Sequence, residues 1–237
     1  MGAGPIHFLP KRIYTHGMFS LEKFRQKYDV DETPYRVAGH SLSFFVPKKI
    51  DPFINQNDIF TNFPLWCKIW EATAVLSFHL STIVPEPGQR FLEIGAGMGV
   101  AGLVGAKLGH NMTITEYNDD AIEFAKANAA LNDIHNVTIC KLDWNAPLIE
   151  GKFNYILGSE VVFKEEDIPG LIFLFKRYLE PEGTILLAEG LRKTTMAFVK
   201  QMEKHYTIAM KKQTMKSQGK EIPIILFKFT DGNERNS

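Results

Sequence analysis

The apolar residues of this chain change their spacing near residue 90. Beyond that point, short apolar runs alternate with segments whose apolar residues recur every three or four positions. The short runs predict strands and the periodic segments predict helices. The predicted strands are Phe91–Ile94, Met112–Thr115, Val137–Leu142, Tyr155–Leu157, Thr184–Ala188, Tyr206–Met210 and Ile222–Phe229. The predicted helices between them are Val100–Leu108, Asp119–Leu131, Asp167–Tyr178 and Thr194–His205.

Strands that alternate with helices indicate an α/β fold with a doubly wound, mainly parallel sheet, here of seven strands. The last two predicted strands are joined by a polar, Lys-rich turn with no helix between them. Such neighbours cannot both be parallel, so we expect one edge strand to be antiparallel.

Before residue 90 the pattern predicts a helix, a hairpin and a second helix. The first helix is Phe19–Tyr28, and the hairpin joins Tyr35–Val37 to Leu42–Val46 around Gly39. The second helix would begin at Pro64, since proline suits a first helical turn. Its apolar face would comprise Leu65, Ile69, Trp70, Thr73, Leu76 and Leu80. We therefore expect residues 1–62 to form an extension with a helix and a β-hairpin, and residues 63–237 to form one compact domain.

Composition and charge exclude several classes of protein. The 237 residues are 45% hydrophobic and 23% charged, which excludes low-complexity, collagen-like and disordered chains. The 27 basic and 27 acidic residues balance, which argues against non-specific nucleic-acid binding. The balance is uneven along the chain, because residues 192–237 carry a formal charge of +6 and residues 1–191 carry −6. A basic tail of this kind is usually a solvated surface, and less often a contact for an acidic partner.

Nothing in the sequence suggests a metal site, a secretory signal or a membrane span. Cys67 and Cys140 lack the spacing of a zinc site. The first residues have neither a basic segment nor an apolar core that would suit a signal peptide. No uncharged apolar run reaches the 18 residues of a membrane helix. We expect a cytoplasmic protein with no membrane partner and no bound metal.

The strongest motif is the glycine-rich turn after the first strand of the predicted sheet. Phe91–Ile94 leads into Gly95-Ala-Gly97-Met-Gly99 and then into a helix. Glycines allow a sharp turn and the close approach of a ligand to the backbone, and the helix presents free N–H groups. By themselves the glycines also suit an ordinary strand-to-helix turn.

Two cofactor classes compete for this turn. Gly97, Gly99 and Gly102 formally fit the G-x-G-x-x-G pattern of dinucleotide enzymes, but that register begins too far beyond the strand. Glu93 precedes the first glycine by two positions, and a carboxylate there is costly to bury without a role. A cofactor with ammonium and sulfonium charges would favour such an acid. The sequence therefore favours S-adenosylmethionine over a nicotinamide or flavin dinucleotide.

Acidic residues also follow the next two strands. Glu116 ends the second strand, where a carboxylate can accept both hydroxyls of a ribose. Asp143 and Trp144 end the third strand and can contact the amino group and ring of an adenine. Each acid alone could be a helix cap. Because carboxyl ends of parallel strands form the ligand-binding edge of such sheets, all three together favour a cofactor site.

The fourth strand ends in a candidate methyl-acceptor site. Glu160 and Phe163 lie three residues apart there. The carboxylate could orient an amine, and the ring could bind its cation. A capping acid and a core aromatic are the alternative reading. The acids at 165–167 would favour a cationic substrate, or would simply suit the start of the next helix.

These motifs together resemble the class I, seven-β-strand S-adenosylmethionine-dependent methyltransferases. More narrowly, they resemble the lysine methyltransferase family that includes the valosin-containing-protein and Hsp70 lysine methyltransferases. The resemblance covers residues 63–229 and rests on Trp70-Glu71-Ala72, Glu93-x-Gly95-x-Gly97-x-Gly99, Leu142-Asp143-Trp144 and Glu160-Val161-Val162-Phe163.

The resemblance implies a site and a reaction. The cofactor pocket would comprise Trp70, Glu93, Gly95, Gly97, Gly99, Glu116, Asp143 and Trp144, and the catalytic acceptor site would comprise Glu160 and Phe163. The cofactor would be S-adenosyl-L-methionine and its product S-adenosyl-L-homocysteine. The acceptor would be an accessible lysine of a protein or, alternatively, a small amine. An oxidoreductase and a non-catalytic adenosine-binding module remain as less favoured readings.

Overall fold

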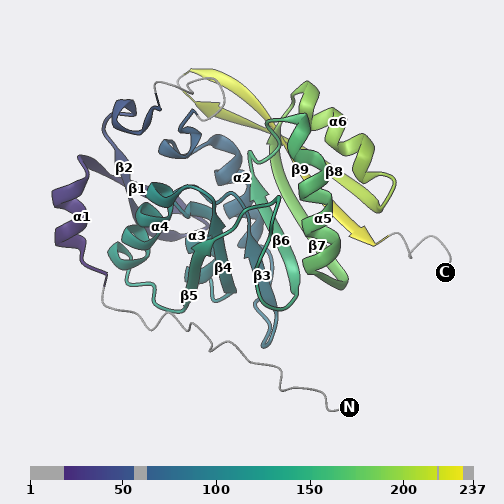
Figure 1. The fold of residues 1–237 in the computed structure, drawn as a ribbon, viewed down its shortest axis with the longest axis horizontal. Coiled ribbons are helices and arrows are strands. Elements are labelled where there is room, and N and C mark those ends of the chain that lie inside the picture. Colours follow the sequence, from purple (N-terminus) through teal and green to yellow (C-terminus); the bar gives the residue numbers. More distant parts are fainter. Residues whose placement is uncertain (1–18, 56–62, 218, 232–237) are drawn as a thin grey trace, which may run out of the picture.

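The computed structural model describes residues 19–55, 63–217 and 219–231, and its main sheet has seven strands (Figure 1). The spatial order is β5-β4-β3-β6-β7-β9-β8, and only β9 runs antiparallel to its neighbours. The strands are β3 Arg90–Glu93, β4 Asn111–Glu116, β5 Val137–Lys141, β6 Phe153–Ser159, β7 Leu179–Gly190, β8 Tyr206–Ser217 and β9 Lys220–Asp231. This confirms the predicted α/β class and the mainly parallel sheet.

The antiparallel strand lies one place inward from where we expected it. β9 inserts between β7 and β8, so β8 forms the edge of the sheet. Burial explains this order, because β9 contributes Ile224, Leu226, Phe227 and Phe229 to the core. β8 is mostly exposed and Lys-rich, which suits an edge strand that must not pair with other chains.

Two buried clusters lie on opposite faces of the sheet, because successive side chains of a strand point to opposite sides. Phe91 belongs to the first cluster and Leu92 to the second. The first face is covered by α2 Glu71–Leu80, α3 Val100–Lys107 and α4 Asp119–Leu131, and the second by α5 Ile168–Tyr178 and α6 Lys193–Met202. The sheet is therefore doubly wound, as predicted.

The helix and hairpin before residue 50 pack against α4 (Figure 1). They are α1 Leu21–Lys27, β1 Val30–Val37 and β2 His40–Pro47, and the two-residue turn between the strands has positive φ at both Ala38 and Gly39. That geometry matches the twist of a hairpin. The rings of Phe24 and Tyr28 lie 4.9 Å from that of Phe124 in α4.

The predicted helix from Pro64 to Leu80 is wrong in its first half. Leu65–Cys67 forms one 3-10 turn, the chain then becomes extended, and α2 begins only at Glu71. The indole Nε1 of Trp70 donates to the carbonyl of Leu65 at 2.8 Å. A continuous helix would pair that carbonyl with the N–H of residue 69 instead. The break places Ile69 and Trp70 on a cavity wall.

Candidate functional site

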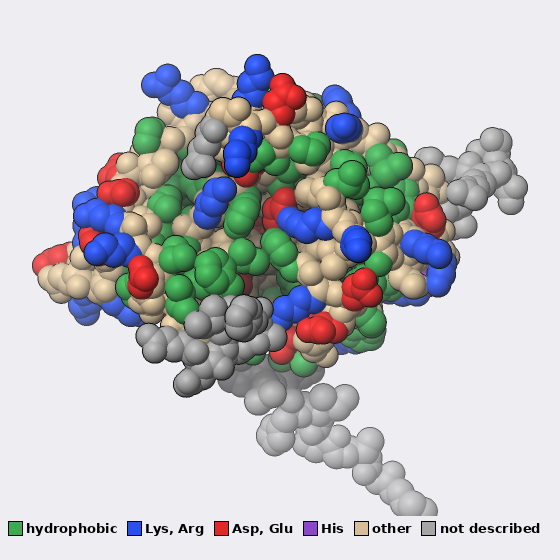
Figure 2. Space-filling view, turned by 90° about the horizontal axis from the view of Figure 1, so that it is seen from above, with side chains coloured by type: hydrophobic (Ala, Val, Ile, Leu, Met, Phe, Trp, Pro, Cys, Tyr) green, Lys and Arg blue, Asp and Glu red, His purple; other side chains and the backbone are tan. Residues whose placement is uncertain are grey.

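A cavity of about 470 Å³ lies at the carboxyl ends of β3, β4 and β6 and beside the segment that follows β5. Figure 2 looks onto this end of the molecule, where hydrophobic side chains are surrounded by basic and acidic ones. A volume of this order suits a drug-sized or nucleoside-sized ligand. Eight of the ten predicted site residues lie on its wall: Trp70, Gly95, Gly97, Glu116, Asp143, Trp144, Glu160 and Phe163.

The glycine turn brings the backbone close to the cavity. Gly95 and Gly97 have φ of +57° and +54°, which favours glycine over other residues. A Cβ atom on Gly95 would also lie 3.1 Å from the ring of Trp144. Gly99 has a different role, since it is the N-cap of α3 and faces Ala125 of α4.

Glu93 is buried beneath the glycine turn and does not reach the cavity wall. Its Oε2 accepts a hydrogen bond from the backbone N–H of Gly102 at 2.9 Å. Burial raises the pKa of Glu93 to about 8, against the lowering effect of that hydrogen bond. The Glu93 carboxyl group therefore joins β3 to the first turn of α3 and is not on the wall of the cavity.

Glu116 lies on the cavity wall and already organises the backbone around it. Its Oε2 accepts from the N–H of Gly97 at 2.9 Å, and its Oε1 accepts from the N–H groups of Tyr117 and Asn118 at 2.7 and 3.0 Å. Each carboxylate oxygen has two acceptor positions. Three of these four positions are occupied, so Glu116 holds the glycine turn and keeps one acceptor position, on Oε2, for a ligand.

Three tryptophans, Trp66, Trp70 and Trp144, line the same cavity from different elements. Trp144 follows β5 and lies against Gly95, while Asp143 beside it accepts from the N–H of Asn145 at 2.9 Å. Trp70 stands at the N-cap of α2, with the ammonium of Lys68 4.5 Å from its ring. Flat aromatic surfaces next to a carboxylate suit a purine ring.

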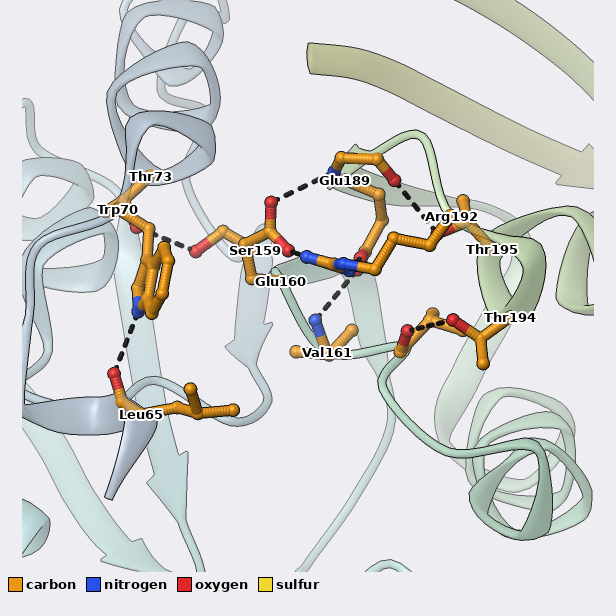
Figure 3. A network of polar contacts seen from close by, with 12 residues as sticks. Leu65, Trp70, Thr73, Ser159, Glu160, Val161, Glu189, Arg192, Thr194 and Thr195 are labelled. Carbon is orange, nitrogen blue, oxygen red and sulfur yellow. Dashed lines mark hydrogen bonds and ion pairs between the residues drawn. The ribbon is translucent and has the colours of Figure 1, made fainter. Parts of the chain in front are cut away.

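Glu160 and Phe163 lie at the end of the cavity that follows β6. Glu160 has a left-handed backbone with φ of +53°, a conformation that costs about 1 kcal/mol or more in a residue other than glycine. Its Oε1 accepts from the N–H of Gly190 at 2.9 Å, and its Oε2 pairs with the guanidinium of Arg192 (Figure 3). The same guanidinium lies 4.5 Å from the centre of the Phe163 ring.

Sequence reasoning missed two residues of this network, Glu189 and Arg192. Glu189 is fully buried at the end of β7, and its Oε1 accepts from the N–H of Val161 at 2.8 Å. The signal was present, since Glu189 is another acid at the carboxyl end of a strand and Arg192 follows it by three positions. The same reasoning that selected Glu116 and Asp143 would also have selected Glu189.

Residues 19–55, 63–217 and 219–231 show neither a metal centre nor a membrane helix. No group of three His, Cys, Asp or Glu residues among them could hold a metal ion. Likewise, no helix in these ranges is long and apolar enough to cross a membrane.

The features of the cavity suit S-adenosylmethionine. It has a glycine turn that lets the ligand approach the backbone, a carboxylate with one acceptor position left for a ribose hydroxyl, and an aromatic ring with an acid for adenine. Glu116 lies on the wall of this cavity together with three tryptophans, and the volume of the cavity suits a ligand of nucleoside size.

Comparisons with known proteins identify the family. The sequence profile described as lysine methyltransferase matches residues 57–213. The chain is 34% identical over 148 residues to protein N-lysine methyltransferase METTL21A of Xenopus tropicalis, covering 60% of this chain and 68% of the relative. It is 29% identical over 130 residues to EEF1A lysine methyltransferase 3 of Mus musculus, covering 53% and 56% of the two chains.

A comparison of structures supports the fold. A tRNA (uracil-54, C5)-methyltransferase of Pyrococcus abyssi, solved in complex with S-adenosyl-L-homocysteine, aligns with a TM-score of 0.59 at 17% identity. The match covers 84% of this chain and 44% of the other. At that identity it shows the fold alone. The profile match spans more than half of the chain, and it shows that the chain belongs to the lysine methyltransferase family of S-adenosylmethionine-dependent enzymes.

Proposed function

We propose that this protein transfers a methyl group from S-adenosylmethionine to a lysine side chain of another protein. The observation that supports this most is the arrangement of a single cavity, which has cofactor-type residues along one part and Glu160 with Phe163 along another. Relatives named as protein N-lysine methyltransferase and EEF1A lysine methyltransferase support a protein lysine as acceptor.

Gly95, Gly97 and Glu116 would bind the amino-acid and ribose parts of the cofactor, whereas Asp143 and Trp144 would bind its adenine. Trp70 would close the cavity from the side of α2. The cofactor, when bound, supplies an activated methyl group on a sulfonium sulfur. Glu93 and Gly99 would act indirectly, because they hold the glycine turn and α3 in place without lining the cavity.

The acceptor must arrive as a neutral amine, although a free lysine side chain has a pKa near 10.4. The lysine ammonium would first give one proton to water. The neutral amine nitrogen would then form a bond to the methyl carbon as the carbon–sulfur bond breaks, with the electron pair of that bond remaining on sulfur and a methylated ammonium as the product. Phe163 would favour the neutral amine by excluding water. Glu160 is engaged by Gly190 and Arg192, so it would orient the amine through its remaining acceptor positions rather than serve as a free base.

The location that we propose is the cytoplasm. Cys67 and Cys140 are both free thiols, and thiols stay reduced in that compartment.

The experiment is a transfer of labelled methyl from S-adenosylmethionine into lysate of the source organism, separated into protein and small molecules. We expect label in one or a few protein bands. Label confined to the small-molecule fraction would contradict a protein acceptor and favour a small amine. The Gly97→Arg variant is the control, because its side chain would project from a left-handed backbone toward Trp66, which lines the cavity. It should give no label in either fraction.

A further inference from the structure

Arg192 connects the carboxyl groups of Glu160 and Glu189 (Figure 3) and also lies over the ring of Phe163. Its guanidinium pairs with Glu160, and its Nη1 lies 3.5 Å from Oε2 of Glu189. Its central carbon lies 4.5 Å from the centre of the Phe163 ring. Arg192 itself is absent from the cavity wall, although Glu160 and Phe163 are on it. Arg192 therefore contacts the two acceptor-site residues without lining the cavity itself.

Glu160 depends on these contacts for its position. The residue has a left-handed backbone, and its N–H donates to the carbonyl of Ala188 at 2.9 Å. Gly190 donates to one carboxylate oxygen and Arg192 pairs with the other. A backbone conformation of this kind persists only where its surroundings hold it. Without Arg192, Glu160 would lose the partner of one oxygen while its side chain remains only 7% exposed.

Glu189, near the end of β7, binds the backbone of the same segment. It accepts from the N–H of Val161, directly after Glu160. Burial raises the pKa of Glu189 to about 8, which disfavours its charged form. Glu160 is also the closer partner, since Arg192 pairs with it directly while Oε2 of Glu189 lies 3.5 Å away. A buried carboxylate that loses its cation is strongly disfavoured. Without Arg192, the Glu160 side chain would therefore turn toward solvent or toward the cavity.

We propose that Arg192 is a positioning residue for methyl transfer, which acts by fixing the carboxylate of Glu160 on the cavity wall. The cation–π contact with the Phe163 ring helps to hold the guanidinium beside Glu160. Arg192 contacts neither the cofactor nor the acceptor in this role. The inference rests on the proposed function, since Glu160 must matter for transfer if its position is to matter.

The test is a double-mutant cycle between Arg192 and Glu160. Arg192→Ala, Glu160→Gln and the double variant are compared for the initial rate of labelled methyl transfer into lysate protein at saturating S-adenosylmethionine. Residues in direct contact give non-additive effects, whereas independent ones add. We expect Arg192→Ala to lower the rate about tenfold or more, and the same change in the Glu160→Gln background to lower it at most about twofold.

Two further measurements separate positioning from folding. We expect calorimetry to give an S-adenosyl-L-homocysteine affinity within about twofold of wild type for each Arg192 variant, because the cofactor residues are untouched. Arg192→Lys keeps the charge but not the planar guanidinium, so its rate should lie between those of Arg192→Ala and wild type. It also replaces Arg192→Ala in the comparison if that variant does not fold. Lys193→Ala is the matched control, an exposed neighbour whose loss should leave the rate unchanged.

The outcomes distinguish the two claims. Additive losses, a rate unchanged or raised in Arg192→Ala, or a loss of cofactor affinity equal to the loss of rate would overturn the positioning role alone. If the wild-type protein itself transfers no label to protein, the proposed function fails and the inference falls with it.

Discussion

The carboxylate of Glu93 lies 2.9 Å from the backbone nitrogen of Gly102, and no side chain fits between them. A Cβ atom on Gly102 would lie 2.3 Å from Oε2 of Glu93 and 2.5 Å from Cγ1 of Ile114. The glycine is therefore required by the close packing of α3 on β3 and β4. Gly102 fits the third position of a dinucleotide pattern, where the glycine likewise serves helix packing, so this residue does not distinguish the two cofactor classes.

Gly102→Ala should destabilise the protein although alanine favours helices. Overpacking of a core typically costs about 1–3 kcal/mol, and the displaced Glu93 would add to it. Urea unfolding measures the loss. Gly170→Ala in α5 is the matched control, because its Cβ meets only Asn145, whose exposed side chain can move, and the backbone of Trp144 at 3.4 Å. Equal stability of the two variants would contradict this account of the glycine.

Glu93→Gln should reduce the pH dependence of stability. Glu93 titrates near 4.5 ordinarily and near 8 in the folded protein. Between these values the folded chain binds the extra proton, so the free energy of unfolding falls as pH rises, by at most about 1.4 kcal/mol per pH unit for one group. The variant should match wild type near pH 5 and exceed it at pH 8.

Denaturant unfolding across this pH range, with exposed Glu150→Gln as control, checks the prediction. Glu189 has a pKa shifted in the same direction, so a smaller slope of the same sign should remain in Glu93→Gln. A slope identical to that of wild type would show that Glu93 is ionised in the folded protein.

Glu116→Gln should weaken cofactor binding. The amide would present an NH₂ group to backbone N–H donors that now meet a carboxylate oxygen, and one charged acceptor for the ribose would be lost. Hydrogen bonds to charged groups contribute about 1.5–3 kcal/mol, so we expect S-adenosyl-L-homocysteine affinity to fall about tenfold or more. Calorimetry measures it, with Glu123→Gln on α4 as a control of equal charge change. Unchanged affinity would exclude Glu116 from the site.

Asn128→Ala should destabilise the junction between the hairpin and the glycine turn. Asn128 is fully buried, accepts from the N–H of Phe45 at 2.7 Å and donates to the carbonyl of Met98 at 3.1 Å. Both backbone groups would lose their partner, at about 1–3 kcal/mol each. Thermal unfolding of the variant measures the loss of stability. Asn132→Ala removes similar bonds to half-exposed Ser43 and should lower the stability less in the same experiment. The reverse order would contradict this ranking.

The sheet and most of the residues that line the cavity could be predicted from the sequence, because both follow local patterns. Runs such as Phe91–Ile94 and the glycines after them have few alternative structures, and ligand sites of parallel sheets gather at one edge. The break before α2 was missed because it depends on a side-chain bond from Trp70 to Leu65, and periodicity does not detect such bonds. The position of β9 depends on which of two late strands is more apolar over its full length.

The environment of Glu160 could not be predicted for a different reason. Its partners, Gly190 and Arg192, come about 30 residues later, and only the pairing of β6 with β7 brings them together. Glu93 shows the converse case. Its position at the carboxyl end of a strand favoured a ligand contact, but the side chain turns into the packing between β3 and α3.

The most direct test of the account identifies the methylated residue by mass spectrometry of lysate proteins labelled by the wild-type protein and by Gly97→Arg and Glu160→Gln. The account predicts methyl-lysine in the wild-type reaction, none with Gly97→Arg, and strongly reduced transfer with Glu160→Gln despite normal S-adenosyl-L-homocysteine binding. Methylation of another residue type, or full transfer by Gly97→Arg, would contradict a lysine methyltransferase that works through this cavity.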